Sequence, residues 1–240
     1  MKTIVLGIAG IILSLSALAD SLDAPVVKEG DTWTYRNTHE KGTDWNQTRD
    51  EIKVSRATSS TIYFAQKQAD STQAVKEAFS GADWSRIRDI NGKETVVNKP
   101  LSFPLSAGKK WEVQYTEQHP NKLHKFEQFD SKYSVIGYEQ IEVPAGKFNA
   151  LKIEVEGNWV AEKEPAQAVI SSAATTASGT SMATEVRKTN EDVVTGRLYK
   201  AFWYVPEVKR WVKSVEEYYS NGGVRSERTT SELESFKFNK

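Results

Sequence analysis

Apolar and polar residues alternate with a period of two over much of the chain after residue 30. In Leu151 to Glu156 the apolar side chains fall on one face and the charged ones on the other, and Trp159 continues the apolar face. A half-buried antiparallel strand has this pattern. We therefore predict a mainly β protein, built as a single antiparallel curved sheet or an incomplete β-barrel.

Two turn signals place hairpins on this pattern. Val143-Pro144-Ala145-Gly146 lies between two alternating segments, and Gly146 is suited to a left-handed backbone conformation. Residues 133–143 and 147–156 are therefore expected to pair. Near the C-terminus, Asn221-Gly222-Gly223 predicts a second hairpin, and Pro206 is expected at a strand end or turn because it cannot donate to a ladder.

Two further segments depart from the strand pattern. Asp70 to Ser80 has a possible cap, apolar residues at helical spacing and Gly81 after it, which predicts one short helix over the sheet. Residues 161–189 are rich in Ala, Ser and Thr and have little apolar area to bury, which predicts a long flexible loop. The alternative for this low-complexity insert is a mobile flap over a binding surface.

The sequence also echoes itself. Gly30-Asp31-Thr32-Trp33-Thr34-Tyr35 is matched by Gly108 to Tyr115, with a Trp three residues after the Gly and a Tyr close behind. A chance match and a duplicated β-meander are both open.

The first 19 residues predict a signal peptide. A basic start, an apolar run from Ile4 to Leu18 and Ala17-Leu18-Ala19 before Asp20 fit the pattern of cleavage by signal peptidase. An uncleaved N-terminal anchor is the alternative. We expect residues 20–240 to form a single β-rich domain that is periplasmic or secreted, with no integral membrane segment after cleavage.

Composition narrows the class of function. The chain has 32 basic and 32 acidic residues, which does not favour nucleic acid as a partner, and no cysteine, which excludes disulfides and a cysteine nucleophile. No nucleophile elbow or phosphate-binding glycine loop is present, and the three histidines, expected in surface loops, do not form a zinc motif. We expect no cofactor, no metal and no enzyme activity, although paired carboxylates from distant strands stay possible.

An aromatic cluster is the candidate binding surface. Trp203, Tyr204 and Trp211 lie in and after an extended segment that places large side chains on both faces. An exposed aromatic patch on an exported β protein could bind lipid, glycan or a partner. Burial of these rings in the core is the alternative.

Several of these motifs resemble a known group of proteins. The segments Val143 to Phe148, Ala150 to Ile153 and Phe202 to Lys213 resemble a V-P-A-G-x-F and W-Y-x-P pattern, and Gly30 to Tyr35 is similar too. The pattern is that of exported Gram-negative β-rich proteins of unknown function, including the TapB-like domains. The resemblance implies a compartment and a fold, and no activity.

These observations together predict an exported, non-enzymatic protein. The expected partner is an apolar or lipid-like ligand, another envelope component, or a protein. The alternative is a hydrolase that acts on envelope glycan or peptide.

Overall fold

Strands make up almost all of the regular structure in the computed structural model, which describes residues 21–69, 71–72, 74–164 and 193–239. The predicted signal peptide and residues 165–189 of the predicted loop lie outside the described residues. The strands are β1 (Thr32–Lys41), β2 (Asp44–Ala57), β3 (Thr61–Gln68), β4 (Lys76–Gly81), β5 (Arg86–Ile90), β6 (Lys93–Asn98), β7 (Lys110–Gln118), β8 (His124–Val143), β9 (Gly146–Lys163), β10 (Val193–Val205), β11 (Arg210–Ser220) and β12 (Arg225–Lys237).

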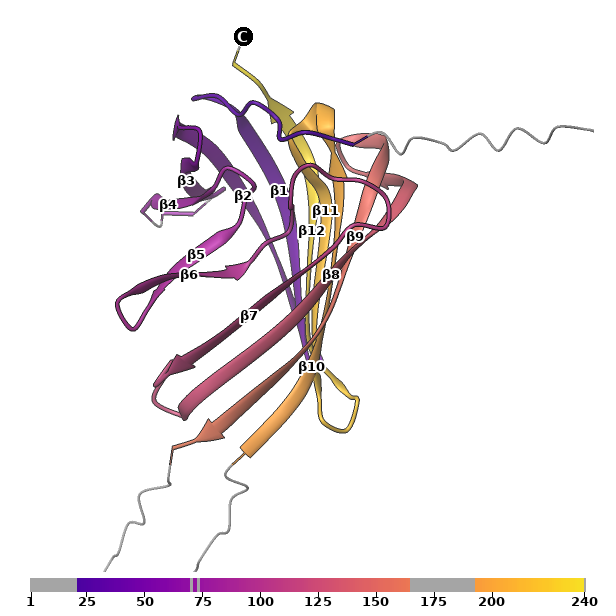
Figure 1. Ribbon diagram of the computed structural model, residues 1–240. Coiled ribbons are helices and arrows are strands. Elements are labelled where there is room, and N and C mark those ends of the chain that lie inside the picture. Colours follow the sequence, from indigo (N-terminus) through magenta and orange to yellow (C-terminus); the bar gives the residue numbers. More distant parts are fainter. Residues whose placement is uncertain (1–20, 70, 73, 165–192, 240) are drawn as a thin grey trace, which may run out of the picture.

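Ten of these strands form one antiparallel sheet in the order β4-β3-β2-β1-β12-β11-β10-β9-β8-β7. Two meanders, β1 to β4 and β7 to β12, are thus joined side by side by the pairing of β1 with β12. The sheet curls so that its edge strands β4 and β7 come round to the same side, where the separate hairpin β5–β6 lies between them (Figure 1). The prediction of a mainly β, curved and unclosed sheet is confirmed.

Both predicted hairpins are present. Val143 pairs with Gly146 across a two-residue loop, and Gly146 has a φ of +132°, in the region that favours glycine. Residues 221–224 join β11 to β12, and Pro206 begins a short 3₁₀ turn, Pro206–Val208, between β10 and β11. The echoed segments each enter the first strand of a meander, β1 or β7.

The predicted helix at Asp70 to Ser80 is wrong. Residues 76–81 are the edge strand β4, which pairs with β3, and the rings of Tyr63 and Phe79 lie 6.3 Å apart. Val75 and Phe79 are 51% and 46% exposed, so the helical spacing does not correspond to a buried face. Pairing with β3 satisfies the backbone and overrides a weak local preference for helix. The start of the predicted loop also shifts, because β9 continues to Lys163.

The core lies on the inner, concave face of the sheet, toward the end that carries the 3₁₀ turn. Three side chains of this core donate hydrogen bonds to carbonyl groups in and after the turn. Trp33 Nε1 donates to Val208 O at 2.8 Å, Trp84 Nε1 to Lys209 O at 3.1 Å, and the Tyr35 hydroxyl to Trp211 O at 2.6 Å. These bonds tie β1 and the β4–β5 connection to the turn between β10 and β11.

Arg210 lies inside this aromatic cluster. Its guanidinium carbon is 4.4 Å from the ring centroids of both Trp84 and Trp211 and 5.2 Å from that of Tyr35. The side chain is buried, and its Nε and Nη1 atoms have no hydrogen-bond partner among the described residues. Burial lowers the pKa of Arg210. Ring faces, not a carboxylate, therefore surround the charge.

Arg210→Met should leave the fold as stable as the wild type, or more stable by up to about 3 kcal/mol. The apolar side chain has a similar length and removes the cost of burying a charge without an ion-pair partner. Urea unfolding of the two proteins measures the difference. A Met variant that is less stable by more than about 1 kcal/mol would show that contacts with the rings outweigh that cost.

Two glycines let inner-face side chains lie against the strands. A Cβ at Gly196 would lie 2.3 Å from the carbonyl oxygen of Tyr219 and 2.5 Å from Nε1 of Trp159. A Cβ at Gly157 would lie 2.3 Å from the carbonyl oxygen of Asp130. Since the backbone itself blocks both positions, only glycine fits without movement of the strands.

Gly196→Ala should lower the free energy of unfolding by about 1–3 kcal/mol, because the added methyl group forces β10 away from its neighbours. Gly222→Ala is the control, since the nearest atom to its added Cβ is 3.9 Å away. Urea unfolding should leave the control within about 0.5 kcal/mol of the wild type. Equal midpoints for the two variants would contradict the close approach at Gly196.

Candidate ligand-binding site

The inner face of the sheet changes from apolar to polar along the same strands. In β1 the inner positions run from Tyr35 to Asn37 and His39, whereas in β10 Lys200 lies between Phe202 and Leu198, which are 5% and 4% exposed. The register pairs Asn37 with Ser231, which keeps the polar positions of adjacent strands on one face. We call the polar half of the inner face the basin. Its residues used below are Asn37, Asp50, Gln66, Tyr115, Glu117, Glu127, Phe129, Ser131, Trp159, Lys200, Glu216, Tyr218 and Ser231.

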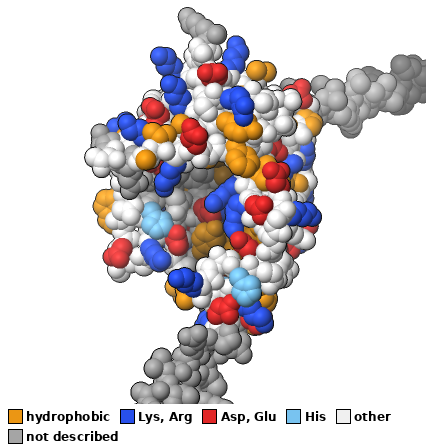
Figure 2. All heavy atoms as spheres, turned by 90° about the vertical axis from the view of Figure 1, so that its left-hand side faces the viewer, with side chains coloured by type: hydrophobic (Ala, Val, Ile, Leu, Met, Phe, Trp, Pro, Cys, Tyr) orange, Lys and Arg blue, Asp and Glu red, His pale blue; other side chains and the backbone are white. Residues whose placement is uncertain are grey.

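The basin is open to solvent on the side where the two sheet edges approach each other. Figure 2 shows a hollow on this side of the molecule, with hydrophobic side chains visible inside it and charged and histidine side chains around it. The basin strands run away from the 3₁₀ turn, toward the lower part of Figure 1. A polar surface is thus enclosed by the curvature of the sheet instead of facing outward.

A chain of hydrogen bonds crosses four strands on one side of the basin. Gln66 Nε2 and Asn37 Nδ2 donate to the same oxygen of Asp50, at 3.1 and 3.0 Å. The Ser231 hydroxyl donates to Oδ1 of Asn37 at 2.6 Å. These half-buried side chains hold one another in place across β3, β2, β1 and β12, as an ordered polar wall.

An ion pair lies near the middle of the basin. Lys200 is only 9% exposed, and its Nζ lies 2.8 Å from Oε1 of Glu216, which also accepts a hydrogen bond from the Tyr218 hydroxyl. Burial raises the pKa of Glu216, but Lys200, Tyr218 and the charge of Arg86 outweigh it and hold that pKa below its usual value. Glu216 is therefore an ionised acceptor at neutral pH.

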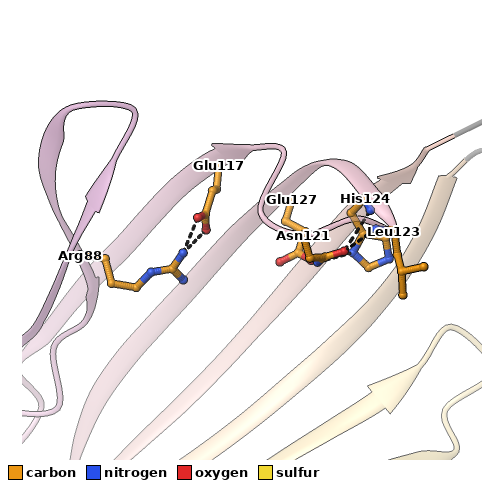
Figure 3. A network of polar contacts seen from close by, with 6 residues as sticks. All are labelled: Arg88, Glu117, Asn121, Leu123, His124 and Glu127. Carbon is orange, nitrogen blue, oxygen red and sulfur yellow. Dashed lines mark hydrogen bonds and ion pairs between the residues drawn. The ribbon is translucent and has the colours of Figure 1, made fainter. Parts of the chain in front are cut away.

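Two carboxylates face each other at the outer end of the basin. Glu117 of β7 and Glu127 of β8 are direct cross-strand partners, an arrangement that is unfavourable for like charges. Arg88 of the hairpin β5–β6 binds both oxygens of Glu117, whereas His124 and Asn121 contact Glu127 at 2.6 and 3.0 Å (Figure 3). Each acid thus has its own cationic or amide partner.

A row of three aromatic residues crosses the basin next to these carboxylates. The register places Tyr115, Phe129 and Trp159 side by side on β7, β8 and β9. The rings of Tyr115 and Phe129 are stacked, with centroids 4.9 Å apart and planes 16° apart. Burial raises the pKa of Tyr115 to about 12, so its hydroxyl is protonated at neutral pH.

The structure places the three predicted binding residues away from the basin. Tyr204 is fully buried on the inner face, where its ring meets Phe103, and half-buried Trp211 packs against Trp84 and Phe202. Trp203 is 9% exposed on the outer face, between Lys152 and Lys213. Ligand binding at these three residues stays a prediction, with no open ring patch to support it.

The outer face has hollows of a different kind. One of about 570 Å³ is lined by polar residues of β8 to β11 such as Asp130, Lys132 and Arg197. Its tyrosine hydroxyls are occupied within the sheet, since Tyr199 donates to Glu154 and Tyr219 to Glu217. Contact with solvent explains the polar side chains of the outer face. It does not explain the polar side chains of the basin that are buried.

The described residues contain no group of three or more side chains suited to hold a metal ion. They also contain no helix with the length and apolar character to span a membrane. The expectation of loop histidines holds only for His119, because His39 lies in β1 and His124 begins β8.

Comparisons with known proteins assign the chain to no family. No family model and no curated protein matches the chain. Two solved structures are similar at 15% identity over 91% of this chain and all of theirs: a "putative exported protein with YmcC-like fold" from Bacteroides fragilis, with a TM-score of 0.45, and a "putative lipoprotein" from Parabacteroides distasonis, with a TM-score of 0.47. The fold and the basin define the class, an open curved-sheet protein with a polar concave face.

The buried tyrosines predict a loss of stability in alkali. Burial raises the pKa of Tyr35 to about 12, against 10 for a free tyrosine, so the unfolded chain loses this proton first as the pH rises. Stability is then complete below pH 10 and falls as the pH rises through 12, by about 3 kcal/mol for a two-unit difference. Urea unfolding at pH 9 to 12 measures it. Tyr35→Phe should make this dependence less steep, because the other buried tyrosines still contribute to it, and an unchanged slope would contradict the assignment.

Proposed function

We propose that the protein is an exported, non-catalytic binding protein that holds a polar ligand in the basin. The observation that supports it is the change from apolar to polar side chains along the inner face of β1, β2 and β12. Lys200 and Ser131 in this lining are only 9% and 7% exposed, so contact with solvent does not account for polar side chains at these positions. A half-buried polar lining with Lys200 and Glu216 at its centre is therefore better explained by ligand binding than by folding.

The chemistry of the lining favours a polar ligand over a lipid-like one. A carrier for acyl chains needs an apolar surface, whereas the basin offers carboxylate, amide, hydroxyl and guanidinium groups. Arg86 is the most available of these, since it is exposed, has no direct hydrogen bond or ion pair among the described residues, and acts on Glu216 and Tyr115 through its charge. The N-terminal segment supports export to the periplasm or beyond.

A hydrolase is the second candidate, and the facing pair Glu117 and Glu127 favours it. Retaining glycosidases place two carboxyl groups about 5–5.5 Å apart. Here Arg88 contacts Glu117 and His124 contacts Glu127. These contacts favour a role for the two acids as part of a binding surface over a role as catalytic groups.

The proposal predicts that polar compounds, not lipids, raise the thermal stability of the protein. Probes are neutral hexasaccharides, hydrophilic hexapeptides and phosphatidylglycerol vesicles. Arg86→Gln should weaken binding of the active probe at least fivefold, because it removes an exposed guanidinium group of β5 whose charge acts on Glu216 and Tyr115 in the basin. Arg197→Gln is the matched control on the outer face and should bind as the wild type does.

Three outcomes would overturn the proposal. Stoichiometric lipid in an organic extract of the purified protein would favour an apolar carrier. Cleavage of a probe, detected by mass spectrometry, would favour the hydrolase. A loss of binding in Arg197→Gln but not in Arg86→Gln would move the site to the outer face.

A further inference from the structure

The aromatic row of Tyr115, Phe129 and Trp159 is unusual for its place in a polar basin. Its three residues are half-buried, neither sealed in the core nor isolated on the surface. Adjacent strands are about 4.8 Å apart, so the row extends about 10 Å across β7, β8 and β9. This length suits several units of a chain ligand better than one small molecule.

Gly196 extends the row onto a fourth strand. It pairs with Trp159, and a Cβ at its position would lie 2.5 and 2.6 Å from Nε1 and Cε2 of the indole ring. The ring therefore lies over the backbone of β10, in the space that a side chain would otherwise occupy. The register thus places three aromatic side chains in one row, and the largest of them lies against the backbone of β10.

Polar groups border this surface on both sides. Glu117 and Glu127 lie one inner-face position further out, and Ser131 and Tyr218 lie one position further in. Two acids of the basin are paired with cations, Glu117 with Arg88 and Glu216 with Lys200. Glu127 contacts His124, and Asp50 accepts hydrogen bonds from the amides of Asn37 and Gln66. A surface whose acids already have partners within the protein suits a ligand without net charge.

We infer that the aromatic row stacks the sugar rings of a neutral oligosaccharide, an inference that rests on the proposed function. A sugar ring has an apolar C–H face and a rim of hydroxyl groups. The aromatic rings would pack on the C–H face. The bordering carboxylates would accept hydrogen bonds from the sugar hydroxyls, and the bordering hydroxyls would donate or accept them. A peptide with exposed rings or prolines is the competing occupant, and the test separates the two.

The test is titration calorimetry of the mature protein with cellohexaose, maltohexaose and chitohexaose. At least one hexasaccharide should bind, and its monosaccharide should bind at least tenfold more weakly, because only the chain spans the row. Trp159→Leu and Tyr115→Leu should each lower the affinity at least tenfold. Trp159→Phe should retain more affinity than Trp159→Leu, since it keeps a ring, and this comparison separates stacking from damage to the fold.

Trp45→Leu is the matched control. Trp45 is 70% exposed and alternates with the inner-face positions of β2, so it faces away from the basin. Its loss should leave the affinity unchanged. An equal loss in Trp45→Leu and Trp159→Leu would overturn the inference.

The inference and the proposed function fail in different ways. If no hexasaccharide binds but a hydrophilic hexapeptide does, and Arg86→Gln weakens it, the saccharide inference is wrong and the proposed function stands. If neither class binds, both are wrong. Binding of a hexasaccharide that depends on Arg197 and not on Trp159 also overturns the inference, because the site would then lie on the outer face.

Discussion

The fold depends on the way in which the turn between β10 and β11 is held. Pro206 to Val208 ends one strand, Lys209 adopts a left-handed conformation, and the carbonyl groups that follow accept hydrogen bonds from Trp33, Trp84 and Tyr35. A buried ion pair, Lys209 with Asp31 at 2.8 Å, adds a further link to the entry of β1. Because the contacts of Trp33, Tyr35 and Asp31 join segments 175 to 178 residues apart in sequence, they fix the two meanders against each other at one end of the sheet.

Because the two meanders are held together at one end of the sheet, their strands can diverge at the other end. Near the turn, the inner faces of the two meanders and the loop with Leu101 and Leu105 meet in a dense core. Further along, the same strands diverge and no second layer formed by the described residues covers them (Figure 1). Polar side chains at the half-exposed positions avoid a large hydrophobic patch, whereas Lys200 and Ser131 are almost fully buried. The polar character of the basin thus agrees with the exposure of part of the inner face as well as with the proposed ligand binding.

Sequence patterns predicted the strands better than the face on which each residue lies. Alternation and turn residues located β8, β9, β11 and β12, because both signals are local. The helix at residues 70–80 was wrong because pairing with β3 is a distant interaction. The basin was missed for a related reason: alternation shows that Glu216 and Lys200 share a face with their neighbours two residues away, but not that this face is concave. A signal was present in β1, where the positions after Trp33 and Tyr35 become polar at Asn37 and His39 without a break in the strand.

The hairpin β5–β6 connects protection of the sheet edges with the proposed site. An unclosed sheet leaves two edges, β4 and β7, with backbone groups that could pair with another chain. The hairpin lies between these edges and is joined to β7 through Arg88 and Glu117 and to β8 through Asn98 and Tyr133, at 2.8 Å. The same strand β5 carries Arg86, whose charge acts on Glu216 in the basin. The hairpin that covers the gap in the sheet therefore also supplies a cationic partner, Arg88, to Glu117 in the basin.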